Sequence, residues 1–225
     1  MKVLIIEDEA DLLTTMDVYL KAGGFLCEHA FTFAEAVQKV SFYEYDCILV
    51  DLNLPDGNGL DIIKKIRESK KTTGVIIVSA MSDLETRLKG LATGADDYIV
   101  KPFHLAELSA RIKSVIRRVN FNGNNSISVG ELRIFPDEVK VFAKEEILDL
   151  TKTEFDLLLF FVSNQNRVIA KETIAEHIWG DYIDMADSFD FVYNHIKNLR
   201  RKIKAVIEDE YIKTVYGIGY KFSIQ

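Results

Sequence analysis

The chain has 225 residues, of which 48% are hydrophobic and 28% charged, and it contains only three prolines. This composition excludes a disordered chain, and the absence of any run near the roughly 20 apolar residues of a membrane span argues against a transmembrane helix. The formal net charge of −7 argues against a nucleic-acid partner for the chain as a whole, although residues 197–204 include five basic residues and no acid.

The first residues and the cysteines indicate a cytoplasmic protein. The sequence MKVLIIEDEA reaches acidic residues after four apolar ones, so it lacks the apolar core of a signal peptide. Cys27 and Cys47 both lie in apolar runs, where we expect buried, reduced thiols rather than a disulfide. We therefore expect no membrane partner.

Five short apolar runs alternate with longer amphipathic stretches over residues 1–118, a pattern typical of βαβ units and a parallel sheet. The predicted strands are residues 3–6, 25–30, 47–50, 75–79 and 97–100. Leu13, Met16 and Leu20 recur at helical spacing before Gly23 and Gly24 end the first helix. The last helix of this part is expected over 104–118. The fold class is thus α/β, with a five-stranded, doubly wound parallel sheet.

A second, smaller α+β domain is expected over residues 127–225. Residues 119–126 are rich in Asn, Gly and Ser, which predicts a linker between the domains. Short alternating strands follow, then helical periodicity from about residue 153 to 204, then a strand-turn-strand segment with Gly217 and Gly219.

Acidic side chains follow two predicted strands that should be neighbours at the switch point of the sheet. Glu7 and Asp8 follow the first strand, and Asp51 follows the third. Like charges about 4 Å apart repel by roughly 4 kcal/mol at an effective dielectric of 20, so the cluster needs a raised pKa or a cation, most simply Mg²⁺. Lys101 and Ser79, at two further strand ends, add a positive charge and a hydroxyl.

The segments IIEDE, ILVDLNLPDGNG, IIVSA and DDYIVKPF stand where receiver domains have their motifs, so residues 1–118 resemble a flavodoxin-like receiver domain. The resemblance implies that Asp51 takes a phosphoryl group from a sensor histidine kinase. It further implies that Asp8, Asp51 and the Asn53 carbonyl hold Mg²⁺, with Glu7 helping through water. Lys101 and Ser79 would then bind the phosphoryl oxygens, and the loop containing Pro55, Gly57 and Gly59 would shape the pocket rim.

Two further roles follow from the same resemblance. Ser79 and Tyr98 would form the switch that moves on phosphorylation, although a half-buried strand aromatic is the alternative for Tyr98. The receiver would dimerise on phosphorylation through paired charges, for which solvated surface charge is the alternative. The matching pairs are Arg87 with Glu107, Asp97 with Arg111, and Asp96 with Arg118.

One predicted helix combines an apolar stripe with a polar face. Val192, Ile196, Leu199 and Ile203 form the stripe. The remaining side chains could enter a major groove or could simply be solvated. The candidate DNA contacts, including those of the terminal hairpin, are Asn194, Lys197, Asn198, Arg200, Arg201, Lys204, Lys213, Tyr216 and Lys221.

The second domain resembles the winged-helix domain of OmpR/PhoB-type regulators through LTKTEFDLLLFF, IAEHIWG, NHIKNLRRKI and IKTVYGIGYKF. The resemblance implies a recognition helix near 188–205 and a wing around Gly217 and Gly219. It also implies double-stranded DNA and RNA polymerase as partners. Asp190, Tyr193 and Tyr216 depart from common family residues, so the target sequence does not carry over from relatives.

Two alternatives to a phosphorylation-controlled DNA-binding regulator remain. A hydrolase with Asp51 as nucleophile would need a general acid where Asn53 stands, and it would leave the winged helix unexplained. A phosphorylation-independent regulator could use its receiver only to dimerise, but such chains usually lack parts of the pocket.

Overall fold

The computed structural model describes residues 1–69, 72–121, 123–180 and 190–224. The chain divides into two compact units, Met1–Gly123 and Asn124–Gln225, and each is treated by itself below. Among the described residues, no helix is both long enough and apolar enough to cross a membrane.

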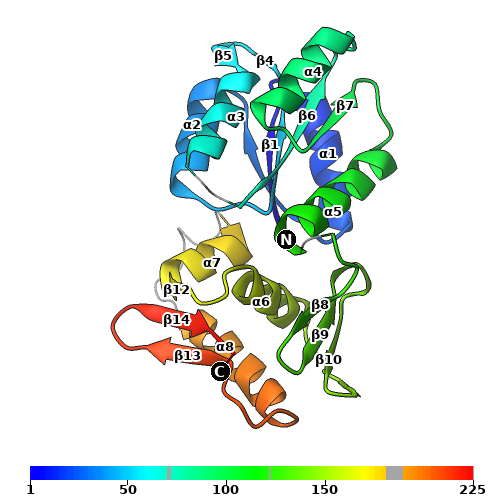
Figure 1. The fold of residues 1–225 in the computed structure, drawn as a ribbon. Helices are drawn as coiled ribbons and strands as arrows, with labels where there is room; N and C mark the ends of the chain where they lie inside the picture. The colour runs from blue at the N-terminus through cyan, green and yellow to red at the C-terminus, as the bar shows by residue number, and fades with distance from the viewer. Residues whose placement is uncertain (70–71, 122, 181–189, 225) are drawn as a thin grey trace. The chain divides into compact units, whose positions relative to one another are not determined.

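The first unit is built on a five-stranded parallel sheet with the order β2-β1-β3-β6-β7, which confirms the predicted α/β class (Figure 1). The strand order reverses between β1 and β3, as the doubly wound topology requires. β1, β3 and β6 are buried throughout because helices cover both faces of the sheet. The strands are β1 Lys2–Ile6, β2 Leu26–Ala30, β3 Cys47–Val50, β6 Gly74–Ser79 and β7 Asp97–Val100.

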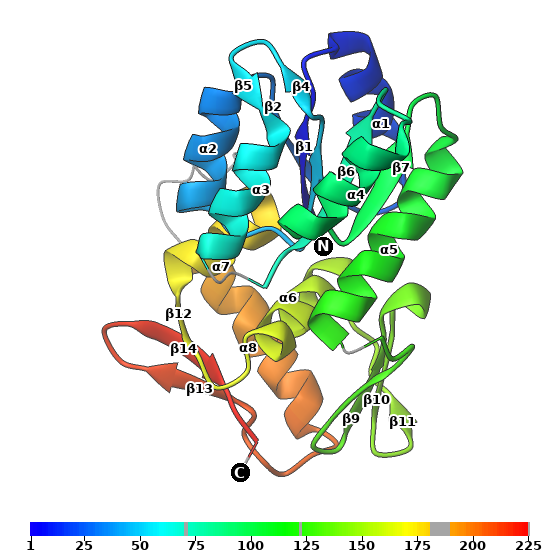
Figure 2. The same cartoon turned by 45° about the horizontal axis from the view of Figure 1, so that its top comes forward.

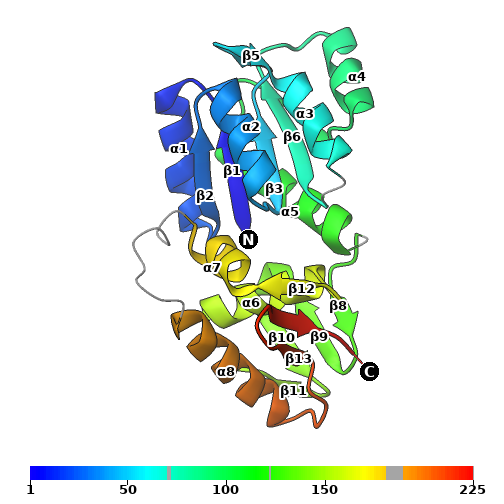
Figure 3. The same cartoon turned by 90° about the vertical axis from the view of Figure 1, so that its left-hand side faces the viewer.

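Five helices cover this sheet, with α1 and α5 on one face and α2, α3 and α4 on the other (Figures 1 and 3). Leu13, Met16 and Leu20 are the buried residues of α1, as their spacing predicts, and Gly23 caps its end. The helices are α1 Ala10–Ala22, α2 Phe33–Phe42, α3 Gly59–Glu68, α4 Leu84–Thr93 and α5 Leu105–Phe121.

Two details of this unit differ from the sequence expectation. Helix α5 continues to Phe121, which is buried, so residues 119–121 are helical where we expected the start of a linker. No glycine or proline interrupts the helix before that point. A small hairpin of β4 (Asn53–Leu54) and β5 (Gly57–Asn58) stands at the carboxyl-terminal edge of the sheet (Figure 2).

The second unit has the α+β composition expected of a winged-helix domain. Antiparallel strands β8 Ile127–Val129, β9 Leu132–Phe135, β10 Lys140–Ala143 and β11 Glu146–Ile147 form one sheet, with a 3₁₀ turn at Pro136–Glu138. The helices that follow in the described residues are α6 Lys152–Ser163, α7 Lys171–Trp179 and α8 Asp190–Lys204. The second sheet has the order β12-β14-β13, formed by β12 Val168–Ala170, β13 Ile212–Val215 and β14 Gly219–Phe222.

Helix α8 packs on α6 through the predicted apolar stripe. Val192, Ile196, Leu199 and Ile203 are all at most 3% exposed, so the opposite side of α8 faces outward. The recognition helix was expected near 188–205, and its first two residues lie outside the described residues.

The two cysteines are free and buried, as their apolar surroundings predict. Burial raises the pKa of the Cys27 thiol to about 12, with nearby Asp17 acting in the same direction. Both thiols therefore behave as small apolar core groups.

Candidate functional site

The structure brings together the three carboxylates that follow β1 and β3. Glu7, Asp8 and Asp51 each have a ligand oxygen within 4.8 Å of the others. The Glu7 and Asp51 residues are 1% and 5% exposed, whereas Asp8 is open to solvent. Buried hard oxygen donors beside an exposed one are a donor set that suits a small divalent cation with bound water.

Lys101, at the end of β7, reaches into this cluster. Its Nζ lies 2.6 Å from Oδ2 of Asp51 and 2.8 Å from the Glu7 carboxylate. Oε1 of the exposed Glu9 is 3.5 Å away, a partner that the sequence patterns did not single out although it stands in the same acidic run. The buried charges are thus partly balanced by one ammonium.

Burial and charge act in opposite directions on the groups of this pocket. Burial raises the pKa of Glu7, although the hydrogen bond from Lys101 opposes the rise. Burial lowers the pKa of Lys101, but hydrogen bonds to Asp51 and Glu7 outweigh that effect and leave the pKa above its usual value. Lys101 is therefore cationic at neutral pH.

The backbone around Asp51 holds its side chain in place. The Asn53 N–H donates to Oδ1 of Asp51 at 3.0 Å, while Lys101 binds the other oxygen. A Cβ at Gly59 would lie 2.2 Å from the Asp51 carbonyl oxygen, so this approach of α3 to the strand end requires glycine.

Ser79 and Tyr98 lie on the neighbouring strands β6 and β7. Ser79 is fully buried, and its Oγ accepts a hydrogen bond of 3.3 Å from the Met81 N–H. The Tyr98 ring is buried, and its hydroxyl donates to the Met81 carbonyl oxygen at 2.7 Å. The segment after β6 therefore connects the buried hydroxyl with the strand aromatic.

Three of the six expected dimer charges form ion pairs with one another within the chain. Arg111 contacts both Asp97 and Glu107 at 2.8 Å. Arg87 lies 6.0 Å from the centroid of the Tyr98 ring.

The expected Asp96–Arg118 pair takes a different form. Arg118 donates to the backbone carbonyl of Asp96 at 2.9 Å. The Asp96 carboxylate instead accepts from Arg67 and from the Val75 N–H, both at 2.8 Å. No sequence pattern indicates Arg67 as the partner of Asp96, because Arg67 lies 29 positions away, on α3.

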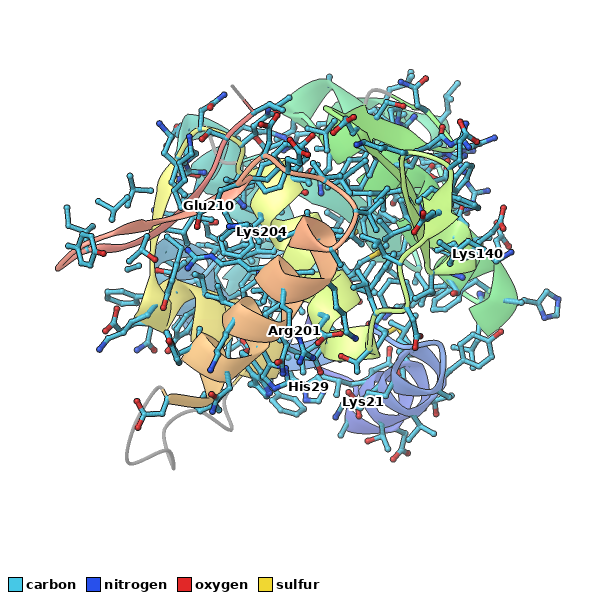
Figure 4. All side chains as sticks on the ribbon, turned by 90° about the horizontal axis from the view of Figure 1, so that it is seen from below. Lys21, His29, Lys140, Arg201, Lys204 and Glu210 are labelled. Carbon is cyan, nitrogen blue, oxygen red and sulfur yellow. The ribbon has the colours of Figure 1, made fainter. Side chains whose placement is uncertain are left out.

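The outward side of α8 is basic and polar. Asn194, Lys197, Asn198, Arg201 and Lys204 are all exposed, and Figure 4 looks onto this helix with Arg201 and Lys204 labelled. Arg200 differs, since it is half-buried, donates to Oγ1 of Thr214 at 2.9 Å and lies 5.4 Å from the centroid of the Tyr220 ring. Arg200 thus joins α8 to the β13–β14 hairpin.

The β13–β14 hairpin sets two lysines opposite each other. Lys213 and Lys221 are register partners, and such like-charged cross-strand pairs are unfavourable unless an anion lies nearby. At the tip, Tyr216 is 92% exposed and Ile218 is 62% exposed. Exposed groups of this kind suit contact with a partner molecule.

Comparison with known protein families matches both units. Residues 3–113 match the family model "Response regulator receiver domain", and residues 144–222 match "Transcriptional regulatory protein, C terminal". The response regulator ArlR of Staphylococcus saprophyticus is 40% identical over 97% of this chain and 97% of its own length. ArlR of Staphylococcus aureus is 37% identical over 97% and 98%, respectively.

Solved structures of response regulators and related proteins are also similar to this chain. A two-component response regulator from Clostridium difficile is 32% identical, with a TM-score of 0.51 over 53% of this chain and 98% of that one. A streptococcal redox sensor described as evolved from two-component response regulators is 27% identical, with a TM-score of 0.50 over 98% of both chains.

Proposed function

The chain belongs to the OmpR/PhoB-type two-component response regulators, which are DNA-binding, and on that premise we propose that a histidine kinase controls it by phosphorylating Asp51. The observation that carries the proposal is the position of Asp51, a nearly buried carboxylate between Glu7, Asp8 and the ammonium of Lys101. Among the roles that residues of a receiver domain play, that of phosphoacceptor fits the position of Asp51 best.

The proposed transfer brings a phosphohistidine of the kinase to the carboxylate, ammonium and hydroxyl groups of this pocket. A carboxylate oxygen of Asp51 attacks the phosphorus of a phosphohistidine, the P–N bond breaks, and the imidazole nitrogen keeps the electron pair. Lys101 is placed to neutralise charge on the phosphoryl oxygens, and Ser79 offers a hydroxyl at the adjacent strand end. Phosphoryl transfer depends mainly on such positioning and neutralisation.

Asp8, Asp51 and the Asn53 carbonyl are the groups we assign to hold Mg²⁺, with Glu7 acting through water. The close approach of three carboxylate oxygens supports this assignment. Bound Mg²⁺ would offset the negative charge of the transferring oxygens. Because Asp8 is exposed, an ion held there would be accessible to water and to the incoming phosphoryl group.

Phosphorylation would reach the rest of the receiver through Ser79 and Tyr98. The Met81 backbone, which bonds to both side chains, supports this route. An inward shift of Ser79 would break the bond from the Met81 N–H and so disturb the carbonyl that holds the Tyr98 hydroxyl. The surface formed by α4, β7 and α5 would then pair with a second copy.

The dimer contacts we propose involve the pairs Arg87–Glu107, Asp97–Arg111 and Asp96–Arg118. Each would exchange part of its present bonding for a contact across the interface, which keeps the net cost of pairing small. Of the three pairs, Asp96–Arg118 should contribute least to the dimer, because the Asp96 carboxylate already accepts hydrogen bonds from Arg67 and the Val75 N–H.

DNA binding would use the outward side of α8 in a major groove and the β13–β14 hairpin beside it. The exposed Asn194, Lys197, Asn198, Arg201 and Lys204 carry the chemistry for base edges and phosphates. Lys213, Tyr216 and Lys221 would contact the backbone from the hairpin, with Arg200 holding the hairpin against the helix. We further propose that RNA polymerase is a partner of this chain. The proposed location of the chain is the cytoplasm.

The test is intact-mass and peptide mass spectrometry of the full chain after incubation with acetyl phosphate and Mg²⁺. We expect one added phosphoryl group on Asp51 in the wild type and none in Asp51→Asn. An unmodified wild type would instead favour a phosphorylation-independent regulator whose receiver serves only to dimerise. That alternative is disfavoured because the pocket residues are all present.

A further inference from the structure

The β4–β5 hairpin forms the rim of the acidic pocket and carries Asn53. Its strands are only two residues long, and an isolated hairpin of that size is marginal in water. Two contacts hold its base, since the Asn53 N–H bonds to Asp51 and the Asn58 side chain accepts from the Leu60 N–H at 2.8 Å at the start of α3. The turn between the strands needs its own attachment.

Asp56, in that turn, supplies the attachment. Oδ1 accepts from the Phe33 N–H at 2.6 Å and Oδ2 accepts from the Ala34 N–H at 3.0 Å. These are the first two residues of α2, so one carboxylate binds two helix N-terminal donors at once. The bonds lower the pKa of Asp56, which keeps it ionised at neutral pH.

The rest of the α2 start is capped by its own residues. The Thr32 side chain accepts from the Glu35 N–H at 3.2 Å, and Glu35 accepts from the Phe31 N–H at 2.8 Å. Asp56 therefore takes only the donors that the local cap leaves. A Cβ at Gly57 would lie 2.5 Å from the Phe33 ring, so the turn also rests directly on α2.

We propose that Asp56 is a positioning residue for the metal site, because it fastens the turn of the β4–β5 hairpin to α2 and thereby fixes the Asn53 carbonyl beside the acidic cluster. The inference rests on the proposed function, in which that carbonyl is a Mg²⁺ ligand. In this role Asp56 would not itself be a metal ligand. It acts through the hairpin backbone, as residues behind metal ligands commonly do.

The test compares Mg²⁺ binding by calorimetry in the full-length wild type and in Asp56→Ala, Asp56→Asn and Thr32→Ala. Loss of such supporting contacts commonly weakens metal affinity by about tenfold or more, and we expect about tenfold in Asp56→Ala. Asp56→Asn, which keeps one acceptor oxygen and the side-chain size, should fall between. Thr32→Ala is the matched control, since it weakens the same helix start without releasing the hairpin, and its affinity should equal that of the wild type.

Hydrogen exchange without Mg²⁺ gives a second readout. The Asn53 amide bonds to the Asp51 side chain, and the Gly59 amide bonds to the Leu52 carbonyl. Both amides should exchange faster in Asp56→Ala, whereas Thr32→Ala should speed exchange only in α2.

Unchanged Mg²⁺ affinity in both Asp56 variants, or an equal loss in Thr32→Ala, overturns the positioning role while leaving the proposed function intact. A wild type that binds no Mg²⁺ overturns the metal site and this role together.

Discussion

The ammonium of Lys101 lies 2.6 Å from the Asp51 carboxylate, although the two residues are 50 positions apart in the sequence. β3 and β7 bring them to the same edge of the sheet, with β6 between the two strands. The same ammonium binds Glu7, so one cation compensates two nearly buried carboxylates. A side chain held in this way is already placed beside the atom that would accept the phosphoryl group.

Replacing Lys101 by methionine should slow phosphorylation of Asp51 by acetyl phosphate by about a hundredfold, the loss commonly seen when one preorganised charge-stabilising group is removed. The measurement is a time course of intact mass with Mg²⁺ present. Lys64→Met is the control, because Lys64 is an exposed lysine on α3 that pairs with Asp61. A Lys101→Met rate equal to that of wild type would show that Lys101 has no part in the transfer.

Lys2 and Glu28 form a buried ion pair at the opposite end of the sheet from Asp51. They lie 2.9 Å apart with side chains 0% and 3% exposed, and the Tyr45 hydroxyl donates to Glu28 at 2.6 Å. Burial opposes ionisation of Glu28, but Lys2 and Tyr45 outweigh it and hold the pKa of this carboxyl below its usual value. The pair therefore stabilises the ionised form of Glu28.

The stability of the first unit should depend on this pair in a defined pH window. Because the folded pKa of Glu28 lies below the unfolded one, its contribution is full above about pH 4 and is lost as the pH falls through the folded pKa. Glu28→Gln should lower the free energy of unfolding by about 3 kcal/mol at neutral pH, since the buried ion pair between Lys2 and Glu28 is broken. The difference from wild type should shrink in acid.

Urea unfolding followed by circular dichroism measures this effect, while fluorescence of Trp179, the single tryptophan, reports on the second unit. Glu68→Gln, on the exposed end of α3, serves as the control and should leave the pH profile unchanged. A constant gap between wild type and Glu28→Gln across the acid range would contradict the assignment.

Charge reversal tests the proposed dimer. With beryllofluoride and Mg²⁺, the full chain should dimerise at micromolar concentration by light scattering, and Arg111→Glu should stay monomeric because it places like charges against Asp97. The double variant Asp97→Arg, Arg111→Glu should dimerise again. Lys113→Glu, an exposed site on the same helix, should behave as wild type. Dimerisation of Arg111→Glu equal to that of wild type would rule out this surface.

Salt dependence separates the roles of α8 and the hairpin in DNA binding. If Lys221 contacts a phosphate, Lys221→Ala should weaken binding equally across sequences and reduce the salt slope by about one unit. If Lys197 reaches a base edge, Lys197→Ala should change sequence preference. Lys140→Ala, on β10, is the control (Figure 4). No effect from either test variant would remove the helix-in-groove assignment.

The strands and the pocket could be predicted because both depend on local pattern. Apolar β-branched runs define strands that are buried on both faces, and the predicted bounds differ from the observed ones by at most one residue at each end. The topology then places any polar residue after β1 or β3 at the same edge. Glu7, Asp8 and Asp51 converge for that reason.

Partners set by tertiary packing could not be predicted. Asp96 has arginines within reach on two helices, and only the packing of α3 gives its carboxylate to Arg67 rather than Arg118. Arg200 stands next to the apolar stripe of α8, so its contact with Thr214 depends on where the hairpin folds. The β4–β5 strands are too short to show any periodicity, so no sequence pattern predicts the contact of Asp56 with α2.

If phosphorylation of Asp51 controls DNA binding, activation of the chain should change its affinity for DNA. The most direct measurement is the affinity of the full chain for genomic fragments enriched by the activated protein, with and without beryllofluoride and Mg²⁺, in wild type and Asp51→Asn. We expect tighter binding on activation of the wild type and no change in Asp51→Asn. Equal affinity of the wild type in both states would contradict it.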